Sequence, residues 1–426
     1  MAFDRIRDLP HACRMTRRPI IGVAVVAILV SALALAATRF PGTDAPATPG
    51  NGSSAVDASA GATPSGTPRP EPQHEVYGFV PYWVMDATIA DHLAKTDLTT
   101  LLLFSVTSAR DGSIDTTQNG YKRIAGDVGK RMIREAHDRG TRVELVFTSF
   151  GSARNARFFG SETVQAVTIA SLVTVTTQLA LDGINVDVEG LGLEDVPAYA
   201  GFVQRLRVAA TAANAKAQVS VATQAGRTGA AMAAAATFAG PMGADRVFLM
   251  GYDYRTGTSD PGASAPMARR DGAEADLVWS LDLYESLGVP VERTLLGLPL
   301  YGIKWPVAGP ALGEARTGPG VTWIPANDPA VITSPQIPPQ TDPIEIVDFY
   351  AIPPANGATP APSDGSPAKG WRAVYVDSPA TLATKLTLAD DRGLAGAGFW
   401  AIGYERGVPG YDELISRFQA GKLAGG

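Results

Sequence analysis

Short apolar segments that alternate with helical patterns constrain the fold of this chain more than any other feature. From about residue 75 onward, eight runs of aliphatic and β-branched residues are separated, in most cases, by longer stretches with helical periodicity. Eight strands with intervening helices over about 350 residues predict a (β/α)8 TIM barrel, an α/β fold, rather than an open doubly wound sheet. No GxGxxG motif or P-loop follows the first expected strand, which disfavours a dinucleotide-binding fold.

The barrel domain is expected to span 75–426. Its expected strands are Val76–Trp83, Thr99–Thr107, Arg142–Ser149, Gly183–Glu189, Gln218–Gln224, Arg246–Tyr252, Thr294–Leu300 and Gly396–Ile402. The expected helices include Tyr121–Arg139, Ser161–Leu181, Pro197–Asn214, Ala273–Leu287 and Pro379–Arg392.

The segment 304–369, between the seventh and eighth expected strands, is too long for an ordinary βα loop. It contains two apolar runs, Val321–Ile324 and Ile344–Ile352, amid many prolines. We therefore expect a small α+β insertion at the catalytic face of the barrel, where it forms one wall of a cleft.

The N-terminal region predicts a location outside the cytoplasm. A basic segment, 1–18, precedes 19 uncharged and mainly apolar residues, 19–37, and positive charge before an apolar run directs the chain beyond that run across the membrane. The length of this run favours a transmembrane anchor, whereas Ala34–Ala36 is an acceptable cleavage site for a signal peptide. Residues 38–74 are rich in Pro, Gly, Ala, Ser and Thr and predict a disordered linker.

Charge and residue usage exclude several functions. The formal net charge of -6 provides no basic surface for nucleic acid. Cys13 is the only cysteine and lies before the apolar run, so no disulfide is expected in the barrel. None of the four histidines falls within the strand motifs that carry the chemistry, and we expect no metal site. We expect a monomer.

The fourth expected strand contains a row of polar residues. Side chains alternate between the two faces of a strand, so Asn185, Asp187 and Glu189 share one face and point into the barrel. Carboxylates that rise to the C-terminal mouth of a TIM barrel are typical of an active site. The alternative is that the three residues are hydrogen-bonded polar fillers of the barrel interior, although buried carboxylates are costly without a purpose.

The motif around this row resembles a known family. Asp182–Glu189 is similar to the DxxDxDxE signature of glycoside hydrolase family 18, the chitinases and related N-acetylglucosaminidases. Further segments resemble the family's motifs in the same order along the chain. They are Gly78–Trp83 on the first expected strand, Met250–Asp253 on the sixth, Gly297–Gly302 on the seventh and Phe399–Trp400 on the eighth. The DGxNxDxE pattern and the Pro261–Pro266 stretch resemble the bacterial spore-germination and cortex-lytic branch.

The sequence departs from the family pattern at four places. Asn185 replaces the middle Asp of the signature, Phe79 stands where many chitinases have Tyr, and Ile303 stands where many have Arg. The SxGG motif of strand three is reduced to Thr148–Gly151. These departures disfavour processive degradation of crystalline chitin more than they affect the chemistry.

The resemblance implies hydrolysis of β-linked N-acetylglucosamine polymers by a substrate-assisted retaining mechanism that needs no cofactor. Glu189 is then the catalytic acid, Asp187 holds the acetamido N–H, and Tyr252 donates to the acetamido oxygen. The implied substrate-binding residues are Asn185, Asp253, Trp400, Tyr301, Trp83 and Phe79.

Two residues of the motif invite a separate interpretation. Asp182 has the wrong parity to face the site and is expected to have a structural role at the start of the strand. Asn185 cannot ionise, so either it leaves Asp187 without a like-charged neighbour and alters the pH dependence, or it is a remote barrel filler that affects only stability.

Two other functions are compatible with the sequence. A sugar-binding lectin can share the fold, but such proteins typically lose the equivalent of Glu189, which this chain retains. A wall-anchored interaction protein is a further alternative. The sequence leaves chitin, peptidoglycan and N-glycan as substrates, and endo or exo cleavage, undecided.

Overall fold

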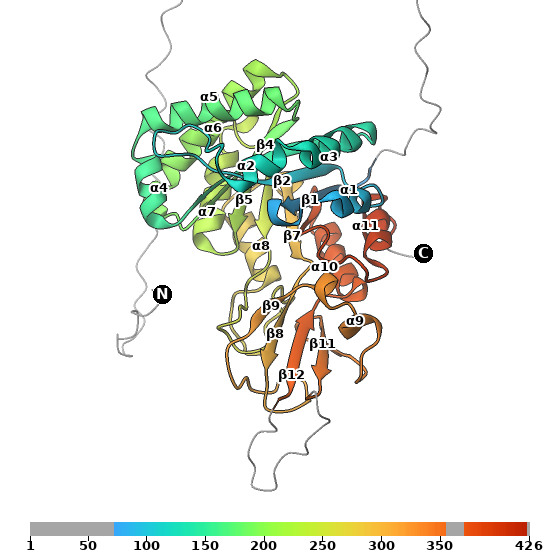
Figure 1. Cartoon of the computed structure of the whole chain (residues 1–426). Coiled ribbons are helices and arrows are strands. Elements are labelled where there is room, and N and C mark those ends of the chain that lie inside the picture. Colours follow the sequence, from blue (N-terminus) through green and yellow to red (C-terminus); the bar gives the residue numbers. More distant parts are fainter. Residues whose placement is uncertain (1–71, 355–369, 424–426) are drawn as a thin grey trace, which may run out of the picture. The chain divides into compact units, whose positions relative to one another are not determined.

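The structure is a computed structural model that describes residues 72–354 and 370–423. Eight parallel strands close into a barrel in the order β1-β13-β7-β6-β5-β4-β3-β2, which confirms the predicted TIM barrel (Figure 1). The barrel strands are β1 (Glu75–Pro81), β2 (Thr100–Val106), β3 (Arg142–Phe150), β4 (Gly183–Glu189), β5 (Gln218–Gln224), β6 (Arg246–Met250), β7 (Thr294–Pro299) and β13 (Gly396–Trp400).

Helices pack around the outside of the barrel, and one continuous hydrophobic core joins them to the strands. The α-helices are α1 (Ala87–Leu93), α2 (Asn119–Ile124), α3 (Asp127–Asp138), α4 (Ser152–Phe159), α5 (Glu162–Gln178), α6 (Val196–Ala213), α7 (Arg227–Thr237), α8 (Leu277–Ser286), α10 (Pro379–Asp391) and α11 (Tyr411–Gln419). Short 3-10 turns lie at Tyr82–Val84, Leu193–Asp195, Gly240–Met242, Val291–Arg293 and Pro325–Asn327.

Most expected elements end within a few residues of the observed bounds, and two differ in kind. The helix expected over Tyr121–Arg139 is two helices, because Gly126 adopts an extended conformation between α2 and α3. The first expected strand stops at Pro81, because Tyr82–Val84 forms a 3-10 turn. This turn places Trp83 at the mouth of the barrel, where 52% of its surface is exposed.

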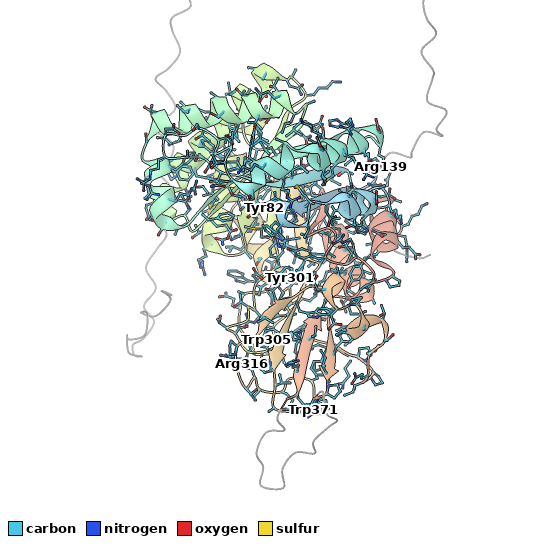
Figure 2. All side chains as sticks on the ribbon, in the orientation of Figure 1. Tyr82, Arg139, Tyr301, Trp305, Arg316 and Trp371 are labelled. Atoms are coloured by element: carbon cyan, nitrogen blue, oxygen red, sulfur yellow. The ribbon has the colours of Figure 1, made fainter. Side chains whose placement is uncertain are left out.

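The insertion is a five-stranded antiparallel sheet of order β10-β11-β12-β8-β9. Its core is a separate cluster around Trp305, Phe349 and Tyr375. Figure 2 shows Trp305 and Trp371 within this part and Tyr301 where it meets the barrel. The elements are β8 (Gly302–Pro306), β9 (Val321–Trp323), α9 (Ala330–Thr333), β10 (Gln340–Asp342), β11 (Val347–Ile352) and β12 (Arg372–Val376).

The sheet extends beyond the expected bounds of 304–369. It begins at Gly302 and ends at Val376, because β12 returns to pair with β8, with Ala373 opposite Trp305. This pairing is between distant segments, so the composition of 304–369 alone could not indicate it.

The expected N-terminal segments 1–18 and 19–37 lie outside the described residues, as does most of the expected linker. The last two linker residues belong to the folded domain, because the backbone N–H groups of Gln73 and His74 donate to the carbonyl of Gln419 at 2.8 and 3.3 Å. Over 72–354 and 370–423, no single helix is long and apolar enough to span a membrane. Only α4 and α5 taken together meet that test, and they are bent by 95°.

Candidate active site

An open cavity of about 440 Å³ lies at the C-terminal ends of the barrel strands. We call it the cleft. Seven of the nine predicted site residues line it, namely Phe79, Trp83, Asp187, Glu189, Tyr252, Asp253 and Trp400. The other residues that line the cleft are Tyr82, Phe104, Ser105, Gln118, Phe150, Ala222 and Met250.

Strand β4 brings the two carboxylates of the motif into the cleft. Asp187 is 4% exposed, and its Oδ1 atom has no hydrogen-bond partner among the described residues. Glu189, at the end of the strand, is half-buried, and its Oε2 accepts a hydrogen bond from Nε2 of Gln224 at 3.0 Å. The predicted alternation is confirmed, because Ile184 and Val186 belong to the core that the helices share.

Both carboxyl groups hold their protons more tightly than usual. Burial raises the pKa of Asp187 well above its ordinary value, and the charge of Glu189 raises it further. Burial also raises the pKa of Glu189, as does the charge of Asp253, while the hydrogen bond from Gln224 opposes the change. A half-buried carboxyl that is open to a cleft and retains a proton has the properties of a general acid.

The loop after β6 supplies Tyr252 and Asp253. Asp253 has a positive φ of 61°, and its N–H donates to Oγ of Ser264 at 3.0 Å. The hydroxyl of Tyr301 donates to Oδ1 of Asp253. Tyr301 is 5% exposed and does not line the cleft, so it positions Asp253 rather than contacting a substrate.

An aromatic wall extends around the mouth from β3, the strand next to Glu189, to β13 on the opposite side of the barrel. We use this name for Trp83, Phe104, Phe150 and Trp400, which come from the β13–β1–β2–β3 side of the barrel. The Phe104 and Trp400 rings are 4.7 Å apart, and those of Phe104 and Phe150 are 6.5 Å apart. One apolar wall and one acidic wall are suited to a sugar, which has apolar ring faces and polar edges.

Comparison with known proteins identifies the family of the chain. The sequence profile of the family described as Glycosyl hydrolases family 18 matches residues 77–405. The chain belongs to glycosyl hydrolases family 18. That match covers the barrel and the insertion, including all nine predicted site residues.

Individual relatives are more distant. Chitinase 63 of Streptomyces plicatus is 27% identical over 182 residues, which is 41% of this chain but only 26% of that protein. The fold is similar to that of the Bacillus cereus spore cortex-lytic enzyme SleL, with a TM-score of 0.63, 18% identity and coverage of 80% of this chain and 74% of SleL. A family 18 N-acetylglucosaminidase from Paenibacillus barengoltzii has a TM-score of 0.63 at 18% identity, with coverage of 81% and 99%.

Asn185, one of the departures from the family 18 signature, does not reach the cleft. It is fully buried, and its Nδ2 donates to Oγ of Ser220 at 2.7 Å. Ser220 in turn donates to Oε2 of Glu144 at 2.5 Å. The predicted substrate contact of Asn185 is therefore wrong for this structure, because the side chain lies one layer below Asp187 and faces the base of the barrel.

The other departures have separate explanations. Ile303 is 2% exposed and belongs to the core of the insertion, so its side chain does not face the cleft. Phe150 replaces a glycine of the SxGG motif and is 44% exposed at the end of β3, directly opposite Glu189 in the strand register. The sequence pattern showed this replacement but did not identify Phe150 as a residue of the cleft.

Asp182 has the structural role that its parity predicted. Its Oδ2 accepts from the N–H of Val143 at 2.8 Å and lies 2.9 Å from Nε2 of His137. A histidine therefore does approach the signature motif at this position, although it lies far away in the sequence, because the fold brings α3 next to the start of β4.

The insertion contacts the loop that carries Asp253 and Ser264, on the side away from the cleft lining. Contrary to expectation, none of the cleft residues in 72–354 and 370–423 comes from its sheet. Instead, Glu345 is fully buried and accepts from Nη2 of Arg255 at 2.5 Å and from the N–H of Ala263 at 2.7 Å. These contacts fix the loop that carries Asp253 and Ser264.

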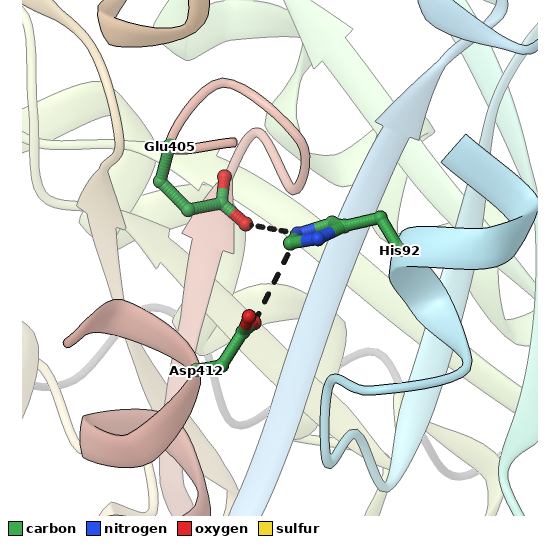
Figure 3. A group of neighbouring side chains, drawn as sticks. All are labelled: His92, Glu405 and Asp412. Atoms are coloured by element: carbon green, nitrogen blue, oxygen red, sulfur yellow. Dashed lines mark hydrogen bonds and ion pairs between the residues drawn. The ribbon is translucent and has the colours of Figure 1, made fainter. Parts of the chain in front are cut away.

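One histidine lies close to two carboxylates where α1 meets the segment after β13 (Figure 3). His92 Nε2 is 2.6 Å from Oε1 of Glu405 and 3.9 Å from Oδ1 of Asp412. These ligand types are able to hold a metal ion. The short His92–Glu405 contact is that of a direct hydrogen bond. This bond ties α1 to the loop after β13, in which the Tyr404 hydroxyl accepts from Nε1 of Trp83 at 3.1 Å.

Proposed function

We propose that this protein is a glycosidase that hydrolyses a β-linked polymer containing N-acetylglucosamine, either chitin-like or peptidoglycan. Family membership supports glycoside hydrolysis, and the aromatic and acidic walls of the cleft suit a sugar chain. Proteins named chitinase, spore cortex-lytic enzyme and N-acetylglucosaminidase are among those that this chain is similar to. The basic and apolar N-terminus supports a location outside the cytoplasm, either anchored or secreted.

The observation that carries the proposal is the unpartnered Oδ1 of Asp187 in the wall of the cleft. A buried acceptor without a donor costs roughly 1–3 kcal/mol. The N–H of a 2-acetamido group supplies that donor, and its hydrogen bond favours the ionised form of Asp187. The hydroxyl of Tyr252 makes no hydrogen bond within the described residues, so it is available to donate to the acetamido oxygen.

The mechanism that this arrangement supports is substrate-assisted. Glu189 gives its proton to the glycosidic oxygen, and the bond from that oxygen to the anomeric carbon breaks. The acetamido oxygen forms a bond to the same carbon, which gives a cyclic oxazolinium ion whose positive charge lies near Asp187. Ionised Glu189 then takes a proton from a water molecule that attacks the anomeric carbon, which opens the ring with net retention of configuration.

The decisive experiment compares substrates with and without the 2-acetamido group. We expect release of saccharides from chitin-type oligomers or peptidoglycan and no release from cellulose-type oligomers of equal length. Product analysis by mass spectrometry distinguishes these cases. Comparable cleavage of cellulose-type oligomers would exclude the substrate-assisted mechanism and show that a carboxylate of the cleft, Asp187 or Asp253, replaces the acetamido group. Binding without any release would favour the lectin alternative.

A further inference from the structure

A second cavity of about 440 Å³ lies next to the cleft, and Gln118 lines both. We call it the arginine pocket, because Arg110, Arg154 and Arg157 line it together with Asp115 and Phe158. None of these residues belongs to the motifs of the family signature. The mechanism proposed above uses none of them.

One side of the pocket is a hairpin that hydrogen bonds and close packing hold against α5. Residues after β2 form a small hairpin in which Ser108 pairs with Ile114, and Arg110 lies near its turn. The hairpin is anchored to α5, because Oγ1 of Thr168 donates to the carbonyl of Gly112 at 2.8 Å. A Cβ atom at Gly112 would lie 2.3 Å from the carbonyl oxygen of Val164, so the two segments are in close contact.

The charges in the pocket are unbalanced. The guanidinium of Arg154 donates to the carbonyl of Ser108, and burial together with the neighbouring charge of Arg157 lowers its pKa. Within 72–354 and 370–423, the side chains of Arg110 and Arg157 form no hydrogen bond or ion pair. Asp115 accepts from the N–H and Oγ1 of Thr117 at 3.0 and 2.6 Å. Three arginines and one carboxylate leave a charge of +2 in the lining.

The pocket is also continuous in sequence with one side of the cleft. Phe150 lines the cleft beside Glu189, on the neighbouring strand, and the backbone continues through Gly151 directly into α4, which carries Arg154 and Arg157. A glycan that crosses the exposed ring of Phe150 and passes Gln118 presents its substituents to these guanidinium groups. Uncharged chitin has no group that would neutralise them.

We infer that the arginine pocket binds a carboxylate carried by a sugar of the glycan that is cleaved at Glu189. This inference rests on the proposed function and narrows its substrate to an acidic N-acetylhexosamine polymer. Guanidinium groups match carboxylates in shape and charge, and charge-assisted hydrogen bonds are about twice as strong as neutral ones. Among polymers that carry the same 2-acetamido group, the pocket therefore favours those that also carry carboxylates.

The test uses two oligosaccharides that differ only in charge. One consists of β-linked N-acetylhexosamines, of which every second sugar carries an ether-linked carboxylate, and in the other each carboxylate is converted to a carboxamide. For the full chain we expect kcat/KM to be about tenfold higher on the acid, a difference of about 1.4 kcal/mol. The double variant R110Q/R157Q should lose this preference and keep its activity on the amide.

The matched control is K130Q/R134Q, which changes the net charge equally at two exposed positions of α3 away from the pocket. It should keep the tenfold preference. Equal turnover of acid and amide by the unmodified chain, or a similar loss on both in R110Q/R157Q, would overturn the inference.

Failure of the proposed function has a different signature, since then neither oligosaccharide nor neutral chitin oligomers are cleaved. Titration calorimetry with both oligosaccharides decides the inference in that case. Tighter binding of the acid that R110Q/R157Q abolishes would support the pocket, and equal binding of acid and amide would reject it.

Discussion

The mouth and the base of the barrel both contain buried carboxyl groups, but only the mouth is built for a reaction. At the base, Glu144 is fully buried, and burial raises its pKa to about 7 despite the hydrogen bond from Ser220. At the mouth, Glu189 also has a raised pKa, yet it lines an open cleft opposite aromatic rings. A perturbed pKa therefore does not identify an active site by itself. The two glutamates differ in whether a substrate can reach them, and this difference marks Glu189 as the candidate catalytic group.

The largest expected effect separates these two glutamates. Glu189→Gln removes the proton that the leaving group needs, so hydrolysis should fall roughly 10²- to 10⁴-fold with little change in stability. Glu144→Gln makes the same chemical change at the base and should leave kcat/KM within about threefold. Steady-state assays on both variants check the comparison, and a Glu189→Gln variant with more than half of the original turnover would refute the assignment.

The base should contribute a separable part of the pH dependence of stability. The pKa of Glu144 rises from 4.5 to about 7 on folding, which corresponds to roughly 3 kcal/mol. Because the folded state holds the proton more tightly, this contribution is complete below about pH 4.5 and disappears as the pH rises through 7. Urea unfolding of the unmodified chain and Glu144→Gln at pH 4.5 and pH 8 should show that the variant loses less stability. Identical pH dependence would show that Glu144 does not titrate in this range.

Asn185 lies between the two regions, and its replacement tests which of them it serves. Its amide donates to Ser220, towards the base, so Asn185→Asp introduces a carboxyl group beside the Ser220–Glu144 pair. We expect a loss of about 1–3 kcal/mol in the free energy of unfolding and little change in the pH–rate profile. A shifted acidic limb with unchanged stability would instead show that Asn185 acts on Asp187.

The smallest expected effect concerns Tyr301, whose hydroxyl holds Asp253 at the mouth of the barrel. Tyr301→Phe removes a hydrogen bond that favours ionised Asp253, so the pKa of Asp253, which burial already raises, should rise further. Loss of this hydrogen bond should cost about 1 kcal/mol in transition-state stabilisation, which would be measured as a several-fold lower kcat/KM at acidic pH. Tyr411→Phe is the control, since it removes a buried tyrosine hydroxyl that bonds to the carbonyl of Asp377 rather than to Asp253. Equal effects of the two variants would indicate a general packing role for Tyr301.

The sequence by itself determined the fold class and the reactive row. Eight apolar runs in alternation with helical patterns admit few architectures, and the period of two along Gly183–Glu189 decided which side chains enter the barrel. Motifs on separate strands also converge predictably, because the C-terminal ends of all eight strands meet at one mouth. Seven of the nine predicted residues accordingly lie in one cleft.

The tertiary structure alone decided the depth at which each polar residue lies and the contacts between distant loops. Asn185 and Asp187 share a strand face, but only strand stagger and the position of Ser220 assign one to the base and the other to the mouth. The pairing of Arg255 with Glu345 joins residues 90 positions apart, and the arginine pocket forms from a hairpin and a helix that no local pattern connects. Such contacts depend on how separate elements pack, whereas strand periodicity and motif spacing are local properties of the chain.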